Sequence, residues 1–380
     1  MRVRHLKLAN FRVFESLDLD FEGDIIFFIG QNGMGKTSIL EAISVIALVR
    51  SFRQAKDQDL IRWGEEHYAV SADIKEDSQN LHLHAAYGLK QGRRLLVNRE
   101  KVTKLADYMG RLPLVVFSPE DLEIVQGGPQ ERRRFLDIVL STLMPLYLES
   151  LQKYQRVLKQ RNALLQRLIR DPLMYRALDE ELARLGAILI QKRREFVQNY
   201  LPNLKNYLHF ISNGQDNWEM TYQPSIPEGD EPMQYLKTLE KGFEYDLKTK
   251  KTNWGIHRDR LLFHPPQKPE TELLQIASQG QKRTLVLALK MAQYSYFTQV
   301  LNKIPLLLVD DVLNELDLSR RQAFVRFLQS VGQAFFTTTD LGEMHTFLRE
   351  KNLAMAVEVF TLSKKEKEQN KTVVVEKLPS

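Results

Sequence analysis

The sequence contains no cysteine, and this absence excludes several kinds of chemistry. None of the 380 residues can form a disulfide, bind a metal through a thiolate or act as a cysteine nucleophile. No apolar run is long enough to span a bilayer, and the basic start Met1-Arg-Val-Arg4 is followed by no signal-like apolar core. We therefore expect a cytoplasmic protein with no membrane partner.

Positively charged residues are only in mild excess over negatively charged ones. The formal net charge is +6, which permits a nucleic-acid partner but is shared by many ordinary enzymes. At 43% hydrophobic residues the chain can bury a substantial core, and its length exceeds one typical domain. We expect a head domain split around an insertion, with residues 1–120 and 263–380 forming the head and residues 121–262 a helical arm.

Apolar patterns predict an α/β fold. Alternation at 17–21 and unbroken apolar runs at 25–29, 114–117, 306–309 and 334–337 are typical of strands. Helical spacing follows at 37–50, and residues 68–103 read as a strand meander that forms a β lobe. After Gly127-Gly-Pro129 the pattern is helical to about residue 201, with an interruption near Asp171-Pro172. This interruption predicts a hairpin of two long helices.

A complete phosphate-binding loop stands between the second strand and the first helix. The segment from Gly30 to Thr37 has the form GxxxxGK[ST], whose glycines let backbone N–H groups curl around a phosphate. Lys36 should reach the β- and γ-phosphates, and the Thr37 hydroxyl should bind Mg²⁺. The predicted ATP contacts here are Gly30, Gln31, Asn32, Gly33, Met34, Gly35, Lys36, Thr37 and Ser38.

Two adjacent carboxylates end the apolar strand at 306–309. Unpaired charge at the end of a buried strand is costly, so a functional role is favoured over an acidic surface turn. Asp310 is suited to hold Mg²⁺, directly or through water. Asp311 is suited to orient and deprotonate the attacking water.

The element Ser278-Gln-Gly-Gln281 indicates which class of nucleotide-binding protein the phosphate loop belongs to. Ser278 could simply cap the helix that follows. About one helix separates it from the 306–309 strand, however, which is the arrangement of ABC-type ATPases. In that class Ser278 and the Gly280 N–H contact the γ-phosphate held by a second copy, and Gln281 belongs to the same contact set. Asn314-Glu-Leu-Asp317 then occupies the place of the loop that crosses the dimer interface.

These segments together closely resemble the RecF family of bacterial DNA repair and recombination ATPases, over essentially the whole chain. The shared segments are Leu8-Ala-Asn-Phe-Arg12, the phosphate loop, Phe117-Ser-Pro-Glu-Asp-Leu122, Gly128-Pro-Gln-Glu-Arg-Arg-Arg-Phe-Leu-Asp137, Gly255-Ile-His-Arg-Asp259, Ser278-Gln-Gly-Gln-Lys-Arg-Thr284 and Leu308-Val-Asp-Asp-Val-Leu-Asn-Glu-Leu-Asp317. Arg12, in the first of these, is included among the predicted ATP contacts.

The resemblance implies an ABC-type head with a short helical arm, the cofactors ATP and Mg²⁺, and a homodimer that forms with ATP. It also implies binding to double-stranded DNA near single-strand junctions, where RecR and RecO help to load RecA. Two positions depart from the family pattern, because Ile256 and Arg260 stand where Pro and a second Asp are usual. The switch histidine of transporter heads is missing, and we expect a Thr or Asp340, rather than His345, to take its place.

DNA contacts are the least defined part of the sequence. A non-specific duplex binder needs several Lys or Arg along a surface. The candidates are Arg50, Arg53, Arg93, Arg94, the run Arg132, Arg133 and Arg134, and Lys192 to Arg194. No aromatic stacking surface, helix-turn-helix or zinc-finger pattern is present, so sequence-specific reading is not expected. A groove between the arms of a dimer is the preferred duplex site.

Three other functions remain as alternatives. A transporter ATPase subunit is disfavoured by the long interval from the phosphate loop to Ser278 and by the missing switch histidine. A passive ATP-binding scaffold would require Asp311 to be catalytically silent. A metabolic kinase has no use for the SxGQ element.

Overall fold

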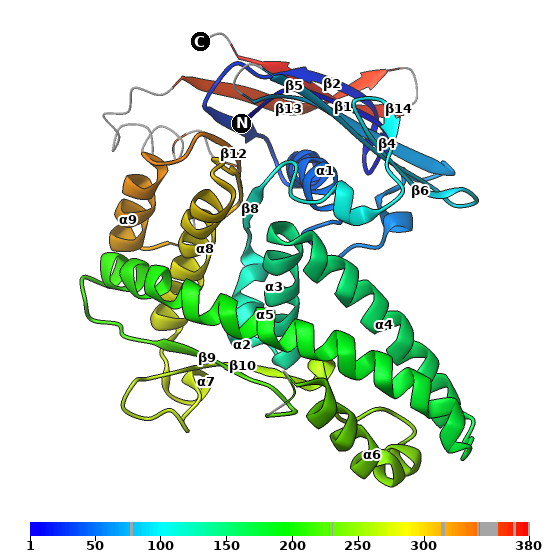
Figure 1. Cartoon of the computed structure of the whole chain (residues 1–380). Coiled ribbons are helices and arrows are strands. Elements are labelled where there is room, and N and C mark those ends of the chain that lie inside the picture. Colours follow the sequence, from blue (N-terminus) through cyan, green and yellow to red (C-terminus); the bar gives the residue numbers. More distant parts are fainter. Residues whose placement is uncertain are drawn as a thin grey trace. The chain divides into compact units, whose positions relative to one another are not determined.

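The computed structural model describes residues 1–76, 79–227, 229, 231–312, 316–339, 342, 356–367 and 370–378. The chain divides into two compact units. The first contains residues 1–121, 210–212 and 290–380, and the second contains residues 122–209 and 213–289. Figure 1 shows the elements of both units.

A mostly parallel sheet forms the centre of the first unit. Its strand order is β14-β13-β3-β12-β11-β8, and every neighbouring pair except β13 and β14 is parallel. The middle strands are fully buried, which explains why their sequences are unbroken apolar runs. The strands are β3 (Ile25–Ile29), β8 (Leu114–Phe117), β11 (Leu306–Asp310), β12 (Gln333–Thr338), β13 (Val357–Lys367) and β14 (Asn370–Lys377).

An antiparallel sheet makes up the predicted β lobe of the same unit. Its order is β2-β1-β4-β5-β6-β7, so the meander expected from the sequence is confirmed. Buried and exposed residues alternate along β2 and β4, as one-sided burial requires. The strands are β1 (Arg2–Phe11), β2 (Phe14–Asp20), β4 (His67–Glu76), β5 (Gln79–Gly88), β6 (Gly92–Val97) and β7 (Glu100–Lys101).

Helix α1 (Lys36–Leu48) contacts both sheets of the first unit, touching β1, β4 and β5 on one side and β8, β11 and β12 on the other. Its apolar residues, among them Ile39, Leu40 and Ile43, join one continuous core with Phe28 and Leu308. This packing fixes the helix that carries the phosphate loop. The remaining helices of this unit are α9 (Leu318–Leu328), the end of α8 (Gln279–Leu301), and the 3₁₀ turns at Asp57–Leu60, Leu105–Asp107 and Pro119–Leu122.

The second unit is mainly helical. Helices α4 and α5 run antiparallel, because Tyr147 near the start of α4 meets Arg193, whereas Arg161 near its end meets Asp179. Figure 1 shows the pair side by side. The elements are α2 (Glu123–Gln126), α3 (Pro129–Leu143), α4 (Pro145–Gln166), α5 (Pro172–Ser212), β9 (Glu219–Gln223), α6 (Pro232–Thr249), a 3₁₀ turn (Ile256–Arg258), β10 (Arg260–His264), α7 (Leu273–Ile276) and the start of α8.

The helical pattern from residue 130 to 201 contains a break that the sequence reading missed. We expected two long helices, and the break at Asp171-Pro172 is confirmed, but α3 and α4 are also separate helices. Met144 between them is extended (φ −132°, ψ 102°) because the residue before Pro145 is sterically kept out of the helical region. Pro145 then becomes the first residue of α4.

The chain passes between the two compact units at 121/122, beside the expected 120/121, and at 289/290, beyond the expected 262/263. The expected division into head and arm stays a prediction. Strand β10 pairs with β9 inside the second unit, so the chain just beyond residue 263 still belongs to that unit. Ser278 therefore belongs to the second unit, and α8 has residues in both.

Fully buried arginines hold the second unit together. Arg161 (0% exposed) donates to Asp179 Oδ1 and to Asp246 Oδ2, each at 2.6 Å. Burial alone would lower the pKa of Arg161, but its two carboxylate partners raise it above the ordinary value. A charge this deep is tolerated only because its partners are in place.

The Gly255-Ile-His-Arg-Asp259 segment is part of a second buried network of this kind. Asp259 (0% exposed) accepts from Arg193 Nη1 at 2.9 Å, from Ser225 N at 2.8 Å and from the Tyr222 hydroxyl. Arg193 also reaches Asp137 at 2.8 Å. Arg260, one of the two unusual positions, forms an ion pair with Glu272.

We expect Asp246→Ala to lower the free energy of unfolding by about 3 kcal/mol or more, because it leaves Arg161 buried beside a missing partner. Arg176→Ala is the control, since its ion pair with Glu180 is exposed and should contribute about 0.5 kcal/mol or less. Urea titration followed by circular dichroism compares the two variants. Equal losses would contradict the structural role given to the buried pair.

Candidate nucleotide site

The phosphate loop connects β3 to α1, as the sequence predicts. Gly33 and Gly35 have left-handed backbones (φ 80° and 88°), which suit glycine best. A Cβ at Gly35 would lie 2.7 Å from Val13 Cγ2, so the turn between β1 and β2 leaves no room for a side chain there. Gln31, Asn32 and Gly33 are exposed, whereas Ser38 is half-buried in the first turn of α1. The loop can therefore bring backbone N–H groups to an outside ligand.

Lys36 is folded onto its own loop. Its Nζ donates to the carbonyl oxygens of Gly30 (2.6 Å) and Gln31 (3.1 Å), and the residue is 7% exposed. Burial lowers the pKa of Lys36, while Asp311 and Asp310 act in the opposite direction. An anion entering the loop would offer this ammonium group stronger partners than two carbonyls.

Asp310 lies at the centre of the site and joins segments far apart in the sequence. Its Oδ1 accepts hydrogen bonds from the hydroxyls of Thr37 (2.8 Å) and Thr337 (2.7 Å). The residue is 5% exposed, and burial raises its pKa although both hydroxyls act to lower it. Thr337 stands directly across from Asp310 in the parallel pairing of β12 with β11.

Asp311 takes a different conformation from its neighbour. Its backbone is left-handed (φ 53°), and its N–H donates to Thr337 Oγ1 at 3.0 Å. This turn leaves Asp311 exposed while Asp310 stays buried. The two carboxylates thus have separate environments, and both lie close enough to Lys36 to oppose the lowering of its pKa by burial.

The residues fit a magnesium ion. The Thr37 hydroxyl and the Asp310 carboxylate are oxygen ligands of the kind Mg²⁺ prefers, and they already lie 2.8 Å apart. Mg²⁺ bound there with ATP would neutralise charge on the β- and γ-phosphates. Thr337 would keep the Asp310 carboxylate oriented, and the exposed Asp311 would remain available to a water molecule.

Arg12 is positioned by the protein rather than left mobile. Its guanidinium makes a bidentate contact with Glu41 (2.7 and 2.8 Å) and donates to the Asp59 carbonyl at 2.8 Å. Glu41 is 0% exposed on α1, and its hydrogen bond is the main reason why the pKa of Arg12 is raised. The turn that carries Arg12 also packs on Gly35 through Val13. An ATP contact by Arg12 stays a prediction.

Ser278 caps helix α8, so the prediction that it acts as a helix cap is confirmed. Its Oγ accepts from Gln281 N (3.2 Å), while its own N–H donates to Gln281 Oε1 (3.0 Å). Gln281 Nε2 in turn donates to Asp216 at 2.9 Å. Ser278 is exposed, and a hydroxyl that accepts through a lone pair still has its proton to donate.

The predicted DNA contacts are largely occupied within the protein. Arg132 is 4% exposed and donates to the carbonyls of Leu261 and Val125, so the structure does not support it as a DNA contact. Several of the other predicted cations have partners too. Arg53 approaches Glu120 (3.6 Å), Arg133 donates to the Asp259 carbonyl (2.9 Å), Arg134 pairs with Glu131 (3.6 Å), and Arg50 is half-buried.

Several predicted residues lie outside the described part of the chain. They are Asn314 and Glu315 of the expected interface loop, and Asp340 and His345. Asp317, at the end of that loop, caps α9 by accepting from Arg320 N at 3.0 Å. Thr337 contacts both aspartates, and the sequence did not predict this role. It predicted only that a residue at the end of this strand senses the γ-phosphate.

The phosphate loop, the paired carboxylates and the two sheets define the ATPase head of the SMC and ABC class. The model of the RecF/RecN/SMC N-terminal domain matches residues 2–367. An SMC head from Pyrococcus furiosus shares the fold, with a TM-score of 0.53 at 15% identity over 99% of this chain and 96% of that one. Among the residues described, no helix has the length and apolar character needed to cross a membrane.

More specific similarity is found to RecF proteins. The DNA replication and repair protein RecF of Leptospira interrogans is 42% identical over 90% of this chain and 92% of its own. That of Halalkalibacterium halodurans is 36% identical over 96% and 100%. A structure of the recombination mediator protein RecF with ATP, described as part of the RecFOR pathway, has a TM-score of 0.85 at 27% identity over 99% and 97%. The chain belongs to the RecF family.

We expect Thr337→Val to reduce ATP turnover by about 10- to 100-fold, because Asp310 and the Asp311 backbone both lose an orienting partner. ATP affinity measured without Mg²⁺ should change little, since the phosphate loop is intact. Thr361→Val on β13 is the control, because the one hydrogen bond of that hydroxyl within the described part of the chain is to the Glu376 carbonyl at 3.4 Å. Unchanged turnover in Thr337→Val would contradict the orienting role.

Proposed function

We propose that this chain is an ATP-driven switch that binds double-stranded DNA. ATP with Mg²⁺ closes two copies on a duplex beside a single-strand gap, and slow, DNA-stimulated hydrolysis opens them again. With RecO- and RecR-type partners the closed dimer promotes the loading of RecA in the cytoplasm. The family membership and the ATP-bound relative described as part of the RecFOR pathway support this function.

The observation that carries the proposal is the hydrogen-bonded group around Asp310. It aligns the hydroxyl of the phosphate loop, a buried carboxylate and the exposed Asp311 in one place. A site that only stored ATP would have no use for a second, solvent-exposed carboxylate next to the first. Asp311 would orient the water that attacks the γ-phosphate. Its side chain is one methylene shorter than that of the Glu usual in ABC enzymes, which favours slow turnover.

The trans role of Ser278 explains why ATP would promote dimerisation. Capping uses only an acceptor position of the hydroxyl, so its proton can be donated to a γ-phosphate held by the second copy. The start of α8 adds backbone N–H groups that favour an anion. These contacts exist only in the closed dimer, so ATP shifts the equilibrium toward it.

The direct test uses the Asp311→Asn protein, in which ATP should bind but not be hydrolysed. Sedimentation with ATP and Mg²⁺ should show a dimer that is absent with ADP, and a gapped duplex should strengthen it. The wild-type protein with ADP is the control. A monomer under every condition would overturn both the trans role of Ser278 and the proposed clamp.

Mixing two inactive variants tests the composite site. Lys36→Ala removes the phosphate contact of one copy, and Ser278→Arg blocks the surface that the copy would offer to its partner. Each variant alone should lose nearly all ATPase activity, whereas the mixture should regain part of it, because one intact composite site forms per mixed dimer. No recovery in the mixture, with both variants folded, would place Ser278 outside the partner's site.

A further inference from the structure

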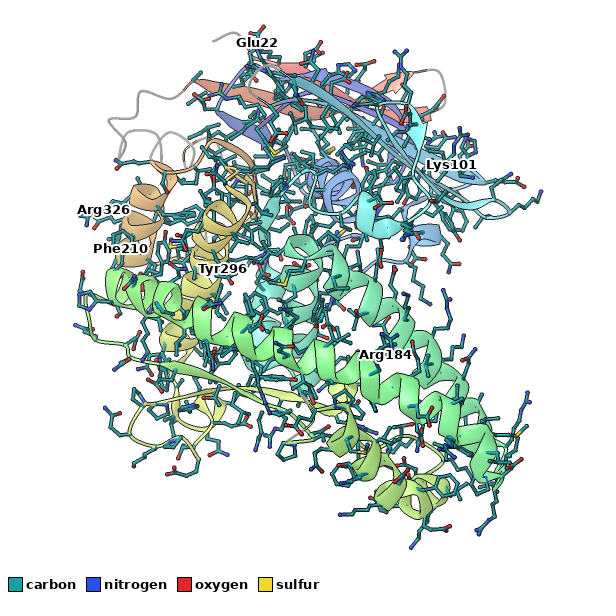
Figure 2. The ribbon with its side chains drawn as sticks, in the orientation of Figure 1. Glu22, Lys101, Arg184, Phe210, Tyr296 and Arg326 are labelled. Atoms are coloured by element: carbon teal, nitrogen blue, oxygen red, sulfur yellow. The ribbon has the colours of Figure 1, made fainter. Side chains whose placement is uncertain are left out.

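The solvent side of α4 is rich in positive charge that has no partner. Between residues 150 and 170 the sequence contains no Asp or Glu. Arg156, Lys159 and Arg167, here called the α4 basic face, are exposed. Their side chains make no hydrogen bond or ion pair with any other residue that the structure describes. Side chains project into solvent along this helix in Figure 2.

Two carboxylates on the neighbouring helix α5 are already compensated. On α5, Arg176 pairs with Glu180 at 3.1 Å and Arg184, labelled in Figure 2, pairs with Glu181 at 2.7 Å. These two carboxylates of α5 therefore have their own arginines. The fourth cation of the α4 surface, Lys153, lies close enough to Glu181 to lower its pKa, so we leave it out of the face.

A shallow groove runs along the same surface. It has a volume of about 420 Å³ and is lined by Gln155, Leu158, Lys159, Asn162, Ala163 and Gln166. Amide side chains can donate hydrogen bonds to phosphate oxygens, and a cation among them adds the charge. The combination is typical of a surface that contacts a nucleic-acid backbone without reading its bases.

The dimensions fit a duplex. Arg156 and Arg167 are separated by about 17 Å along the helix, at 1.5 Å per residue. A duplex presents about one backbone charge every 1.7 Å of its axis, so this length faces about ten phosphates. Three cations over that distance can each meet a different phosphate.

Other ligands fit less well. A membrane-binding helix inserts an apolar face, but the apolar residues of α4, among them Leu151, Tyr154 and Leu165, are buried in the protein. Single strands are held by stacking on exposed aromatic side chains, and the described residues of the α4 surface offer none.

We propose that the α4 basic face binds the sugar-phosphate backbone of duplex DNA. This inference rests on the proposed function and assigns it a surface. It also replaces Arg132, which is buried, with cations that a phosphate can reach.

The test is the salt dependence of duplex binding by the full chain with ATP and Mg²⁺, measured by anisotropy of a labelled blunt duplex. Arg156→Gln/Lys159→Gln should weaken binding by about tenfold or more. The slope of log K against log salt should fall by about 1.8, because each lost phosphate contact contributes about 0.9. Glutamine keeps the helix propensity of the two positions.

The matched control is Arg99→Gln/Lys101→Gln, which removes the same two charges from exposed positions in the other unit. Lys101 lies on β7 and is labelled in Figure 2. This variant should bind the duplex with a nearly unchanged slope. ATP-dependent dimerisation should be normal in both variants, which shows that they are folded.

The outcomes separate the two proposals. If the wild-type protein binds no duplex, the proposed function fails. If it binds and the α4 variant keeps the wild-type slope, or the control variant loses as much, the α4 assignment is overturned. Vesicles of phosphatidylglycerol form a further arm, and α4-dependent binding to them without duplex binding would also overturn it.

Discussion

The hydrogen bonds that converge on Asp310 are the constraint on which the nucleotide site depends. A buried carboxylate is costly unless donors surround it, and Thr37 and Thr337 supply two hydroxyls within 2.8 Å. Each hydroxyl comes from a different element, so α1 and β12 must both be correctly placed against β11 for the buried Asp310 carboxylate to be tolerated. The same contacts that stabilise this arrangement also bring a carboxylate suited to Mg²⁺, a loop hydroxyl and Asp311 together. The pairing of β11 with β12 is therefore also what brings the parts of the site together.

The interior of the second unit differs from that of the first unit's nucleotide site, because it contains fully buried arginine side chains. Arg161 and Arg193 are at most 1% exposed and are compensated by Asp179, Asp246, Asp137 and Asp259. Such pairs are weak evidence for net stability, but removing one partner is severe, so they enforce a single arrangement of the helices. Two of these carboxylates, Asp179 and Asp246, are held by Arg161 of α4 and are therefore not available to the cations on its surface.

The sequence was sufficient where one segment contains the whole signal. The phosphate loop, the fully buried strands and the paired aspartates are local patterns, and the structure places them as expected. It was insufficient where a partner is distant. The meeting of Thr337 with Asp310 depends on β12 lying beside β11, and the burial of Arg132 depends on β10. The run from Arg132 to Arg134 predicts DNA contacts, but the fold buries Arg132. The absence of acidic residues between 150 and 170 was a signal that could have been used.

Helix α8 contains residues of both compact units. Its first residues, capped by Ser278, belong to the second unit, and its residues from Lys290 onward belong to the first. Lys290 pairs with Asp121 at 3.0 Å, and Asp121 accepts from Ser118 N at 2.8 Å, directly after β8. Strand β8 is in turn the neighbour of β11, the strand that ends in Asp310. In the proposed function, a contact made at Ser278 would therefore act on a helix whose later residues are tied by an ion pair to the edge of the sheet that carries Asp310.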